Sequence, residues 1–388
     1  MPPRILLITN IPSHHQIAFG EALHRLLGDR FRLAIIKPVS AERRELGWRD
    51  ASRGLPFVIR AWDSKSAWNE MADDIRDFDA VIRGDAPASL VRQRIKRGKL
   101  TFCYTERIWK KGFWRVLNPR VWPALWQSFW SVNRVNHHLL AASAYCAWDL
   151  SRIGAFRNRM WKWGYFATTP SQPPPAKPRG TPRILWAGRM IRWKQAAHLV
   201  QAAGILKRRG MAFRMELIGD GPRRPAIDRN VRRSGLADLV ALHRAMPPDR
   251  VREEMLASHI YVLPSSFQEG WGVVVNEAMA SGCCVVSSHG AGAAPWLIRH
   301  GETGFLYPNG DVRALANILE KLLLAPEQCA TIGRQAWEYV RAVWSPEAAA
   351  QRLLALCGGL LGAGPMPDFA EGPCSRAEVQ CPQTLFRK

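Results

Sequence analysis

No run of apolar residues in this chain approaches the roughly 20 that a membrane-spanning helix needs. The first residues, Met-Pro-Pro-Arg and then a four-residue apolar run, also carry no long apolar core with a cleavage site. We therefore expect a buried strand there rather than a secretory signal. The eight cysteines form no C-x-x-C pair and no regular spacing. They favour reduced thiols in a cytoplasmic protein over a zinc site or a disulfide framework.

Two familiar signatures are present only as fragments. The tripeptide Asp77–Asp79 has the Asp-x-Asp pattern of metal-binding transferases, but an apolar run follows it directly, so we interpret it as a turn before a strand. The tripeptide Gly290–Gly292 has neither the third glycine nor the strand-to-helix context of a dinucleotide fingerprint. No nucleic-acid-binding motif is recognisable.

Acidic residues are scarce. The chain has 55 Lys and Arg against 32 Asp and Glu, a formal net charge of +23. Such a charge implies an anionic partner, which is a nucleic acid, an anionic membrane surface or a phosphorylated substrate. Charge alone does not choose among the three.

Apolar runs and amphipathic stretches alternate along all 388 residues, which favours an α/β fold with parallel sheets covered by helices. We expect strands at residues 4–9, 31–36, 80–83, 100–104, 138–142, 183–188, 214–218, 260–263, 285–287 and 304–306. We expect helices at residues 16–27, 86–97, 144–153, 194–208, 250–257, 273–280, 312–324, 327–344 and 346–356.

A proline-rich break near the middle predicts two domains. The expected parts are an N-terminal Rossmann-like domain, a linker, a C-terminal Rossmann-like domain, a helix that packs back toward the first domain, and a disordered tail. Their expected bounds are residues 1–167, 168–182, 183–343, 344–357 and 358–388.

The densest set of chemically useful residues is the segment 267–282, Phe-Gln-Glu-Gly-Trp-Gly-Val-Val-Val-Asn-Glu-Ala-Met-Ala-Ser-Gly. It follows an expected strand, so it lies at the carboxyl edge of a parallel sheet, where open α/β folds bind ligands. Gly270 and Gly272 allow close approach of the backbone, and the helix after them offers N–H groups to a pyrophosphate. Glu269 and Glu277 can reach two hydroxyl-bearing parts of one ligand, a sugar and a ribose.

This segment resembles the retaining glycosyltransferases of family 4, whose GT-B architecture has two Rossmann-like domains with parallel sheets facing a central cleft. The resemblance covers most of residues 183–324, with further motifs at 184–189 together with Lys194, at 217–222 and at 301–306. The runs 9–12 and 162–166 are similar to those of family members that build bacterial surface polysaccharides.

The resemblance implies that Arg189 and Lys194 bind the donor diphosphate, that Glu269 binds the transferred sugar and that Glu277 binds the ribose. The two cations would stabilise the dianion that develops as the nucleoside diphosphate departs, so we expect no metal and no cofactor, the nucleotide-sugar being a substrate. The expected donor contacts include six neighbours: Gly188, Gly219, Gly270, Trp271, Gly272 and Val273. Of these, Gly219 lies in a motif that also reads as a simple turn.

Three departures from the family pattern leave the identity of the donor open. Residues 10–15 after the first strand carry no paired glycines, residues 240–244 carry no glycine, and the run 293–295 stands where many members have an acid.

The N-terminal half supplies weaker signals. Glu106, after an expected strand, is a candidate to accept the acceptor's proton or to orient the acceptor, with His14 and His15 as rivals. Alternatively, Glu106 simply pairs with Arg107 or Lys110. Between residues 92 and 120 there are ten Lys or Arg and one acid, and Trp122, Trp126 and Trp130 follow at a spacing of four. On one helix these rings form a stripe that contacts an anionic membrane, packs on the sheet or lines the acceptor pocket.

Together these patterns predict a retaining, hexosyltransferase-type glycosyltransferase. It would move a sugar from a UDP- or GDP-sugar to a lipid-linked or polysaccharide acceptor, in the cytoplasm and at the inner face of a membrane, with no nucleic acid as partner. A nucleotide-sugar epimerase of the same architecture, a basic nucleic-acid-binding protein and a non-catalytic scaffold remain alternatives.

Overall fold

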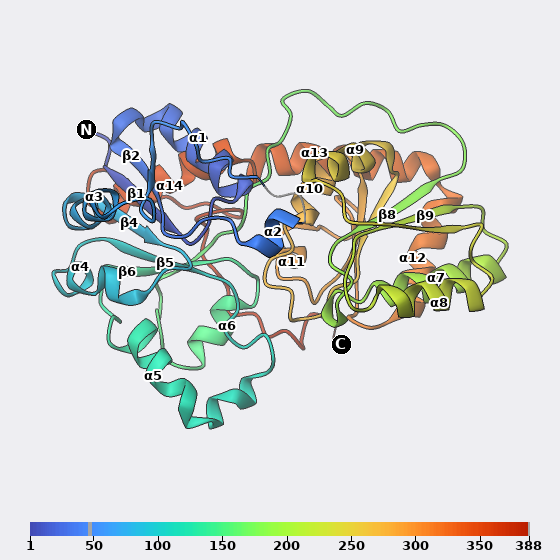
Figure 1. Cartoon of the computed structure of the whole chain (residues 1–388), viewed down its shortest axis with the longest axis horizontal. Helices are drawn as coiled ribbons and strands as arrows, with labels where there is room; N and C mark the ends of the chain where they lie inside the picture. The colour runs from blue at the N-terminus through green and yellow to red at the C-terminus, as the bar shows by residue number, and fades with distance from the viewer. Residues whose placement is uncertain (46–48, 387–388) are drawn as a thin grey trace. The chain divides into compact units, whose positions relative to one another are not determined.

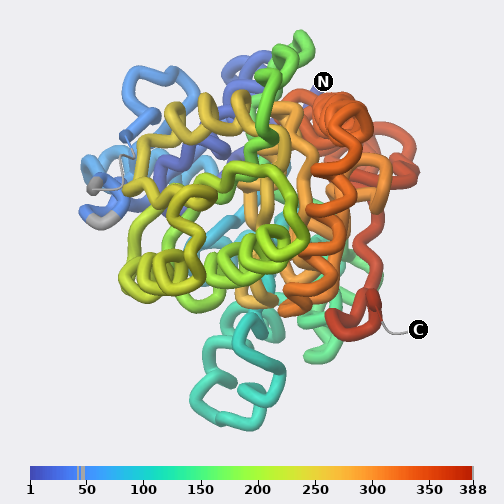
Figure 2. The backbone as a smooth tube through the Cα atoms, turned by 90° about the vertical axis from the view of Figure 1, so that its right-hand side faces the viewer, coloured from blue at the N-terminus to red at the C-terminus, as the bar shows by residue number. Residues whose placement is uncertain are grey.

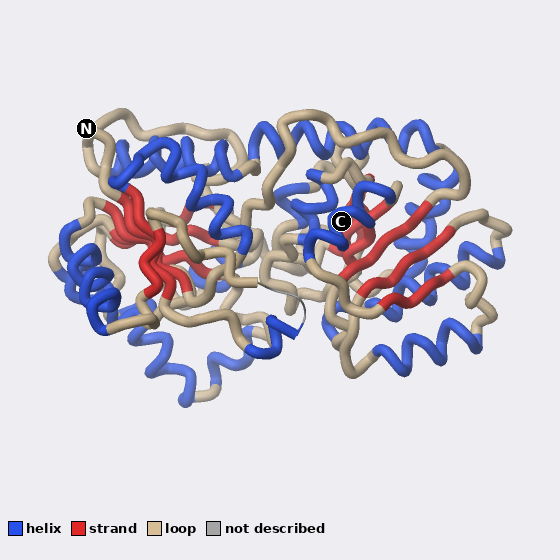
Figure 3. The backbone as a smooth tube through the Cα atoms, turned by 45° about the horizontal axis from the view of Figure 1, so that its top comes forward, coloured by secondary structure: helices blue, strands red, loops and turns tan. Residues whose placement is uncertain are grey.

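The structure is a computed structural model that describes residues 1–45 and 49–386, and it divides into two compact units. Unit 1 combines Met1–Arg44, Arg49–Phe166 and Val343–Cys381, and unit 2 contains Ala167–Ala342 and the end of the chain from Pro382. Each unit has its own sheet, drawn in red in Figure 3, and every named strand pair in both sheets is parallel. The expected α/β fold with two parallel sheets is confirmed.

The sheet of unit 1 has seven strands in the order β3-β2-β1-β4-β5-β6-β7. Its central strands are continuous apolar runs because helices cover both faces; β1, for example, is buried along its whole length. The strands are β1 (Ile5–Thr9), β2 (Phe31–Ile35), β3 (Val58–Arg60), β4 (Ala80–Arg83), β5 (Thr101–Thr105), β6 (His137–Ala141) and β7 (Met160–Lys162). The Asp77–Asp79 tripeptide is the predicted turn: Asp77 ends α3 and the backbone N–H of Arg4 donates to the Asp79 carboxylate at 2.7 Å.

Helices from both ends of the chain cover this sheet. The long helix α14 packs against α1, and Arg25 on α1 forms an ion pair with Glu347 on α14 at 2.6 Å. The helices are α1 (His14–Leu27), α2 (Ala41–Glu45), α3 (Lys65–Asp77), α4 (Arg92–Lys96), α5 (Trp122–Leu125), α6 (Cys146–Ser151) and α14 (Pro346–Leu360).

The segment after α14 is folded onto β7. The backbone N–H of Lys162 donates to the Ser375 carbonyl and that of Cys374 donates to the Lys162 carbonyl, both at 2.8 Å. Cys374 and Ser375 are buried. The prediction of a disordered tail is therefore wrong for these residues. Their composition is typical of coil, but backbone pairing with a distant edge strand orders them. Residues 387–388 lie outside the described part.

The sheet of unit 2 has six strands in the order β10-β9-β8-β11-β12-β13. In Figure 1, α7, α8 and α12 lie on one side of it and α9, α10 and α13 on the other. The strands are β8 (Arg183–Ala187), β9 (Arg214–Ile218), β10 (Val240–His243), β11 (Ile260–Leu263), β12 (Cys284–Ser288) and β13 (Phe305–Tyr307). The helices are α7 (Ala196–Arg208), α8 (Arg224–Arg233), α9 (Pro248–Ala257), α10 (Val274–Ala280), α11 (Ala294–Leu297), α12 (Val312–Leu324) and α13 (Pro326–Val343).

Part of the proline-rich stretch 168–182 packs onto unit 2. The ammonium of Lys177 donates to the backbone carbonyls of Met255, Leu256 and Ser281 at 2.7–3.1 Å. Burial lowers the pKa of Lys177. This contact holds the stretch where α9 and α10 end.

The order of strands in each sheet reverses once, between β1 and β4 in unit 1 and between β8 and β11 in unit 2. At such a switch point the connections leave in opposite directions, and the gap between them is where doubly wound folds bind ligands. In unit 2 the two strands that flank the switch point, β8 and β11, end at Ala187 and Leu263. Among the described residues no helix is both long and apolar enough to cross a bilayer.

Candidate functional site

The loops after β8 and β9 form a close glycine turn at one side of the unit 2 switch point. Gly188 donates its N–H to the Ile218 carbonyl at 2.9 Å, and Met190 donates to the Asp220 carbonyl at 2.7 Å. Gly219 has φ +149°, and a Cβ there would lie 1.9 Å from the Gly188 carbonyl oxygen. Gly219 is thus required for the turn itself, which positions the backbone of the loop that carries Arg189.

That loop carries both cations predicted to bind the donor diphosphate. Arg189 is exposed two residues after the end of β8. Lys194 ends a 3-10 turn, Arg192–Lys194, so it precedes α7 instead of lying within the helix expected from residue 194 onward. The helix starts later because Gln195 adopts φ +52°, a left-handed conformation.

Lys194 meets an acid from the loop after β11. Its ammonium lies 2.5 Å from the carboxylate of Glu269, and the two side chains are only 16% and 13% exposed. A second link between the loops is the hydrogen bond from the Ser266 N–H to the Trp193 carbonyl at 2.8 Å. The structure therefore brings together two side chains that the sequence placed 75 positions apart.

Glu277 lies in the first turn of α10, after Val273, whose carbonyl accepts its backbone N–H at 3.1 Å. The carboxylates of Glu277 and Glu269 both act on Tyr261, a β11 residue whose hydroxyl bonds to the backbone of Ala187 at the end of β8. Burial raises the pKa of Tyr261, and the field of the two carboxylates raises it further. Both acids thus contribute to the electrostatic environment of one buried hydroxyl, which bonds to the end of β8.

The Gly-Trp-Gly segment between the two acids fixes the loop. Trp271 is buried and donates its indole N–H to the side-chain oxygen of Asn276 at 2.9 Å, and its backbone carbonyl accepts the N–H of Ala293 at 2.9 Å. Gly272 has φ +89°, and a Cβ there would lie 3.0 Å from Leu263. Gly270 precedes this sharp turn and is buried.

One group that the sequence did not single out joins four loops of this site. The side-chain amide of Asn309 donates to the Gln195 side chain at 3.1 Å, the Ser265 carbonyl at 3.3 Å and the Ser288 hydroxyl at 2.9 Å. Gln195 and Ser265 follow β8 and β11, Ser288 is the last residue of β12, and Asn309 itself follows β13. The Pro-Asn-Gly sequence at 308–310 signals a turn, but nothing in it signals a cross-loop anchor.

In unit 1 the predicted acceptor-side residues lie near the ends of β1 and β5. Glu106 forms an ion pair with Lys110, whereas Arg107 pairs with the buried carboxylate of Asp149 at 2.9 Å. The hydroxyl of Tyr165 is also influenced by this acid: burial raises the pKa of Tyr165, and the negative charge of Glu106 raises it further.

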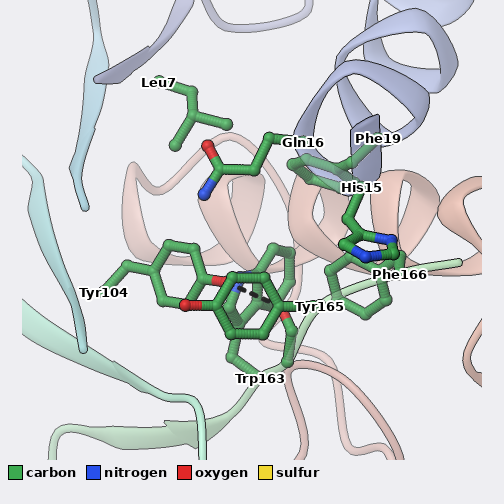
Figure 4. Close-up of a pocket in the computed structure, with 9 residues that line it drawn as sticks. Leu7, His15, Gln16, Phe19, Tyr104, Trp163, Tyr165 and Phe166 are labelled. Carbon is green, nitrogen blue, oxygen red and sulfur yellow. Dashed lines mark hydrogen bonds between the residues drawn. The ribbon is translucent and has the colours of Figure 1, made fainter. Parts of the chain in front are cut away.

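His15 and Tyr165 line a small pocket of unit 1, and the ring centroids of His14 and His15 are 3.8 Å apart. Figure 4 shows the amide of Gln16 and the rings of Tyr104 and Tyr165 facing this pocket, with the Tyr104 hydroxyl bonded to the Gly164 carbonyl at 3.1 Å. The lining is Leu7, His15, Gln16, Phe19, Tyr104, Trp163, Gly164, Tyr165 and Phe166.

The predicted tryptophan stripe is only partly formed. α5 continues as a π-helical turn, Trp126–Trp130, which rotates the side chains away from a spacing of four. Trp122 and Trp126 are exposed, while Trp130 turns inward and donates its indole N–H to the Ile153 carbonyl at 2.7 Å.

Part of this chain is similar to known glycosyltransferases. Residues 169–338 match the family model "Glycosyl transferases group 1". The "Amylovoran biosynthesis glycosyltransferase AmsK" of Erwinia amylovora is 35% identical over 145 residues, or 36% of this chain and 35% of AmsK. The "Alpha-D-kanosaminyltransferase" of Streptomyces kanamyceticus is 30% identical over 172 residues, or 44% of each chain. The alignments thus span less than half the length of these curated relatives.

Among solved structures, HepE of Anabaena in complex with UDP aligns with a TM-score of 0.67 and 15% identity, covering 90% of this chain and 98% of HepE. At that identity the likeness concerns the fold, and it confirms the expected GT-B architecture. The resemblance to group 1 glycosyltransferases, drawn from residues 183–324, is confirmed by the overlapping match at 169–338.

Proposed function

We propose that this chain, whose residues 169–338 form a group 1 glycosyltransferase domain, transfers a hexose from a UDP- or GDP-sugar to a lipid-linked or polysaccharide acceptor with retention of configuration. The observation that carries the proposal is the Lys194–Glu269 pair at the switch point of unit 2, with Glu277 in the helix that follows the Glu269 loop. HepE was solved with UDP, and AmsK is a biosynthetic glycosyltransferase; both support a nucleotide-sugar as donor.

The charges suit the departure of a nucleoside diphosphate. As the bond between sugar and phosphate breaks, negative charge accumulates on the diphosphate, and fixed cations stabilise that state more than the ground state. Arg189 and Lys194 lie on one loop and would supply these charges without a metal ion. Lys194 is already held at low exposure by Glu269, so little reorganisation is needed when the diphosphate binds.

The acids would then bind hydroxyls. Glu269 contacts Lys194, so it would hold the sugar that is directly bonded to the diphosphate. Glu277, eight residues further along the chain, would hold the ribose. The backbone of the intervening Gly-Trp-Gly segment, together with Gly188 and Val273, would face the phosphates.

Unit 1 would supply the acceptor side. Glu106, which is ion-paired with Lys110 and raises the pKa of the buried Tyr165, is the proposed group to orient the acceptor hydroxyl, with His14 and His15 beside the adjoining pocket. We place the reaction in the cytoplasm, at the inner face of a membrane that residues within 92–130 would meet.

A turnover assay tests the proposal. The protein is incubated with UDP- and GDP-sugars, with and without lipid-linked saccharides, and the release of UDP or GDP is measured. Acceptor-dependent release that Glu269→Gln abolishes, and that the exposed control Glu302→Gln leaves intact, is the expected result. Conversion of the donor to another sugar nucleotide without acceptor would instead identify an epimerase. NMR of the product anomer tests retention, and activity in EDTA tests independence of metal.

A further inference from the structure

Unit 1 carries a surface on which aromatic side chains and unpaired cations lie together. Three of the four described tryptophans that are strongly exposed fall within 13 residues: Trp114 (68%), Trp122 (52%) and Trp126 (59%). Leu117 lies between them and is 80% exposed. We call residues 111–126 the aromatic platform. Figure 1 shows α5, which belongs to it, standing apart from the strands of the unit 1 sheet, and the segment is the teal one in Figure 2.

The platform is anchored at its start by a buried acid. Asp149 accepts hydrogen bonds from the Arg107 guanidinium at 2.9 and 3.2 Å and from the backbone N–H of Trp109 at 3.0 Å. The guanidinium of Arg152 lies 3.8 Å from the ring centroid of Phe113, at the near edge of the platform.

Its other end is anchored by apolar packing. Leu125 and Phe129 are buried, and Phe129 packs edge-on against Phe156 with ring centroids 6.2 Å apart. The inner face of this helical turn is therefore already filled. Trp122 and Trp126, four residues apart, lie on the outer face and are held there by packed neighbours.

The polar atoms of two exposed rings are already satisfied. The indole N–H of Trp114 donates to the Lys111 carbonyl at 3.1 Å, and that of Trp122 donates to the Val116 carbonyl at 2.8 Å. Each ring can therefore enter an apolar layer without burying an unbonded donor. In water these exposed rings make no stabilising contact. At the boundary of a bilayer the same rings are removed from water, which is favourable.

The charges of the platform are all of one sign. It contains Lys111, Arg115 and Arg120, and residues 107–136 contain no acid. None of the ion pairs between described residues uses these three cations. They are thus open to phosphate groups, and no carboxylate in the platform would repel an anionic surface.

We infer that the aromatic platform docks onto an anionic lipid bilayer, with Trp114, Leu117, Trp122 and Trp126 entering the headgroup region and Lys111, Arg115 and Arg120 contacting lipid phosphates. This inference specifies the membrane contact of the proposed function, but it is tested by vesicle binding and not by sugar transfer. A failure of vesicle binding would therefore remove the membrane contact but leave sugar transfer standing, and a failure of sugar transfer would leave the membrane contact standing.

The test is co-sedimentation of the full chain with vesicles of phosphatidylcholine alone and with 30% phosphatidylglycerol, a fraction of about the order found in anionic membranes. Binding only to the anionic vesicles is expected, and it should weaken as salt is raised. Each cation near such a surface contributes about fivefold to partitioning, so Arg115→Gln/Arg120→Gln should bind roughly 25-fold more weakly. Trp122→Ser/Trp126→Ser should lose binding by at least about tenfold.

Two further variants keep the test sharp. Leu117→Ser changes an 80% exposed side chain and cannot unfold the chain by opening a core, so it should weaken binding with an unchanged Tm. Trp68→Ser, at an exposed tryptophan on α3, is the matched control and should bind normally.

Several outcomes would overturn the inference. Equal binding to both kinds of vesicle would contradict a preference for anionic lipid. Normal binding by the Trp122/Trp126 and Leu117 variants would show that the platform does not contact the membrane. Single-stranded RNA bound by the native chain and released by the same variants, with no vesicle binding, would make it a nucleic-acid surface. A dimer that the tryptophan variants dissociate, again without vesicle binding, would make it a self-association surface.

Discussion

The ammonium of Lys194 lies 2.5 Å from the carboxylate of Glu269, and this pair joins the loop after β8 to the loop after β11. Both side chains are more than four-fifths shielded from water. If the pair serves the proposed function as well as the fold, single substitutions would change stability and activity together.

Lys194→Met leaves the Glu269 carboxylate in a poorly hydrated place without its cation. We expect it to lower the free energy of unfolding by about 1–3 kcal/mol, because a shielded charge has lost its partner. Adding Glu269→Gln should restore most of that stability, as measured by urea unfolding. Transfer activity should remain lost in the double variant, which would separate the two roles; a recovery of activity along with stability would show that the pair is only structural.

Gly219→Ala tests the glycine turn. The substitution adds a Cβ 1.9 Å from the Gly188 carbonyl oxygen, at φ +149°, so the turn must move. We expect a loss of about 3 kcal/mol or more by urea unfolding. Gly210→Ala is the matched control, since its φ is +72° but no atom lies within 4 Å of the added Cβ; it should cost about 1 kcal/mol. Equal losses would mean that the close approach is readily relaxed.

The sequence predicts the central strands well and the edges poorly. Residues 4–9 and 260–263 were expected as strands and are β1 and β11, because a strand buried on both faces leaves an unbroken apolar run. The edge strands β3 and β7 have three residues each and were not predicted. The pairing of Lys162 with Cys374 and Ser375 joins residues more than 200 positions apart, which no local pattern encodes.

For the candidate site, the sequence predicted residues but not the contacts between them. Glu269 and Lys194 were found through motif spacing, whereas their ion pair depends on the order of strands in the sheet. Asn309 was missed because its role is purely geometric, in joining loops that meet only after folding. The orientation of Trp130 was missed because a π-helical turn shifts the periodicity by one residue per turn.

Acid should destabilise unit 1 through two neighbouring histidines of β6. Burial lowers the pKa of His137 to about 3 and that of His138 to about 4. In the unfolded chain each takes up a proton near pH 6.5, so stability is present above that pH and is lost as the pH falls toward 4. The loss from each residue is about 1.4 kcal/mol per pH unit once the pH is well below 6.5.

Urea unfolding at intervals from pH 7.5 to 4.5 measures this effect. His138→Gln keeps an acceptor for the Trp161 indole N–H, which donates to the His138 ring at 3.3 Å, and removes the titrating group. Below pH 6.5 the free energy of unfolding of this variant should fall less steeply with decreasing pH than that of the native chain. The slopes should differ by the uptake of about one proton on unfolding, or about 1.4 kcal/mol per pH unit. Identical slopes in the two proteins would show that His138 is protonated in the folded state.

The proposed diphosphate-binding role of Arg189 can be tested apart from stability because its side chain is exposed. Arg189→Ala should leave the Tm of the ligand-free protein nearly unchanged. A ligand at 100 times its Kd stabilises the native state by about 2.7 kcal/mol, so UDP or GDP should raise the Tm of the native protein measurably.

The matching nucleoside monophosphate is the control ligand, since it has the same base and ribose but no β-phosphate. In the native protein the diphosphate should stabilise more than the monophosphate, because the cations of the loop after β8 contact the second phosphate. In Arg189→Ala that difference should shrink by about 1–2 kcal/mol, while binding of the monophosphate persists through Glu277. If the variant weakens both ligands equally, Arg189 supports the fold of the nucleotide site and not the diphosphate; if it weakens neither, the cation that stabilises the leaving group lies elsewhere.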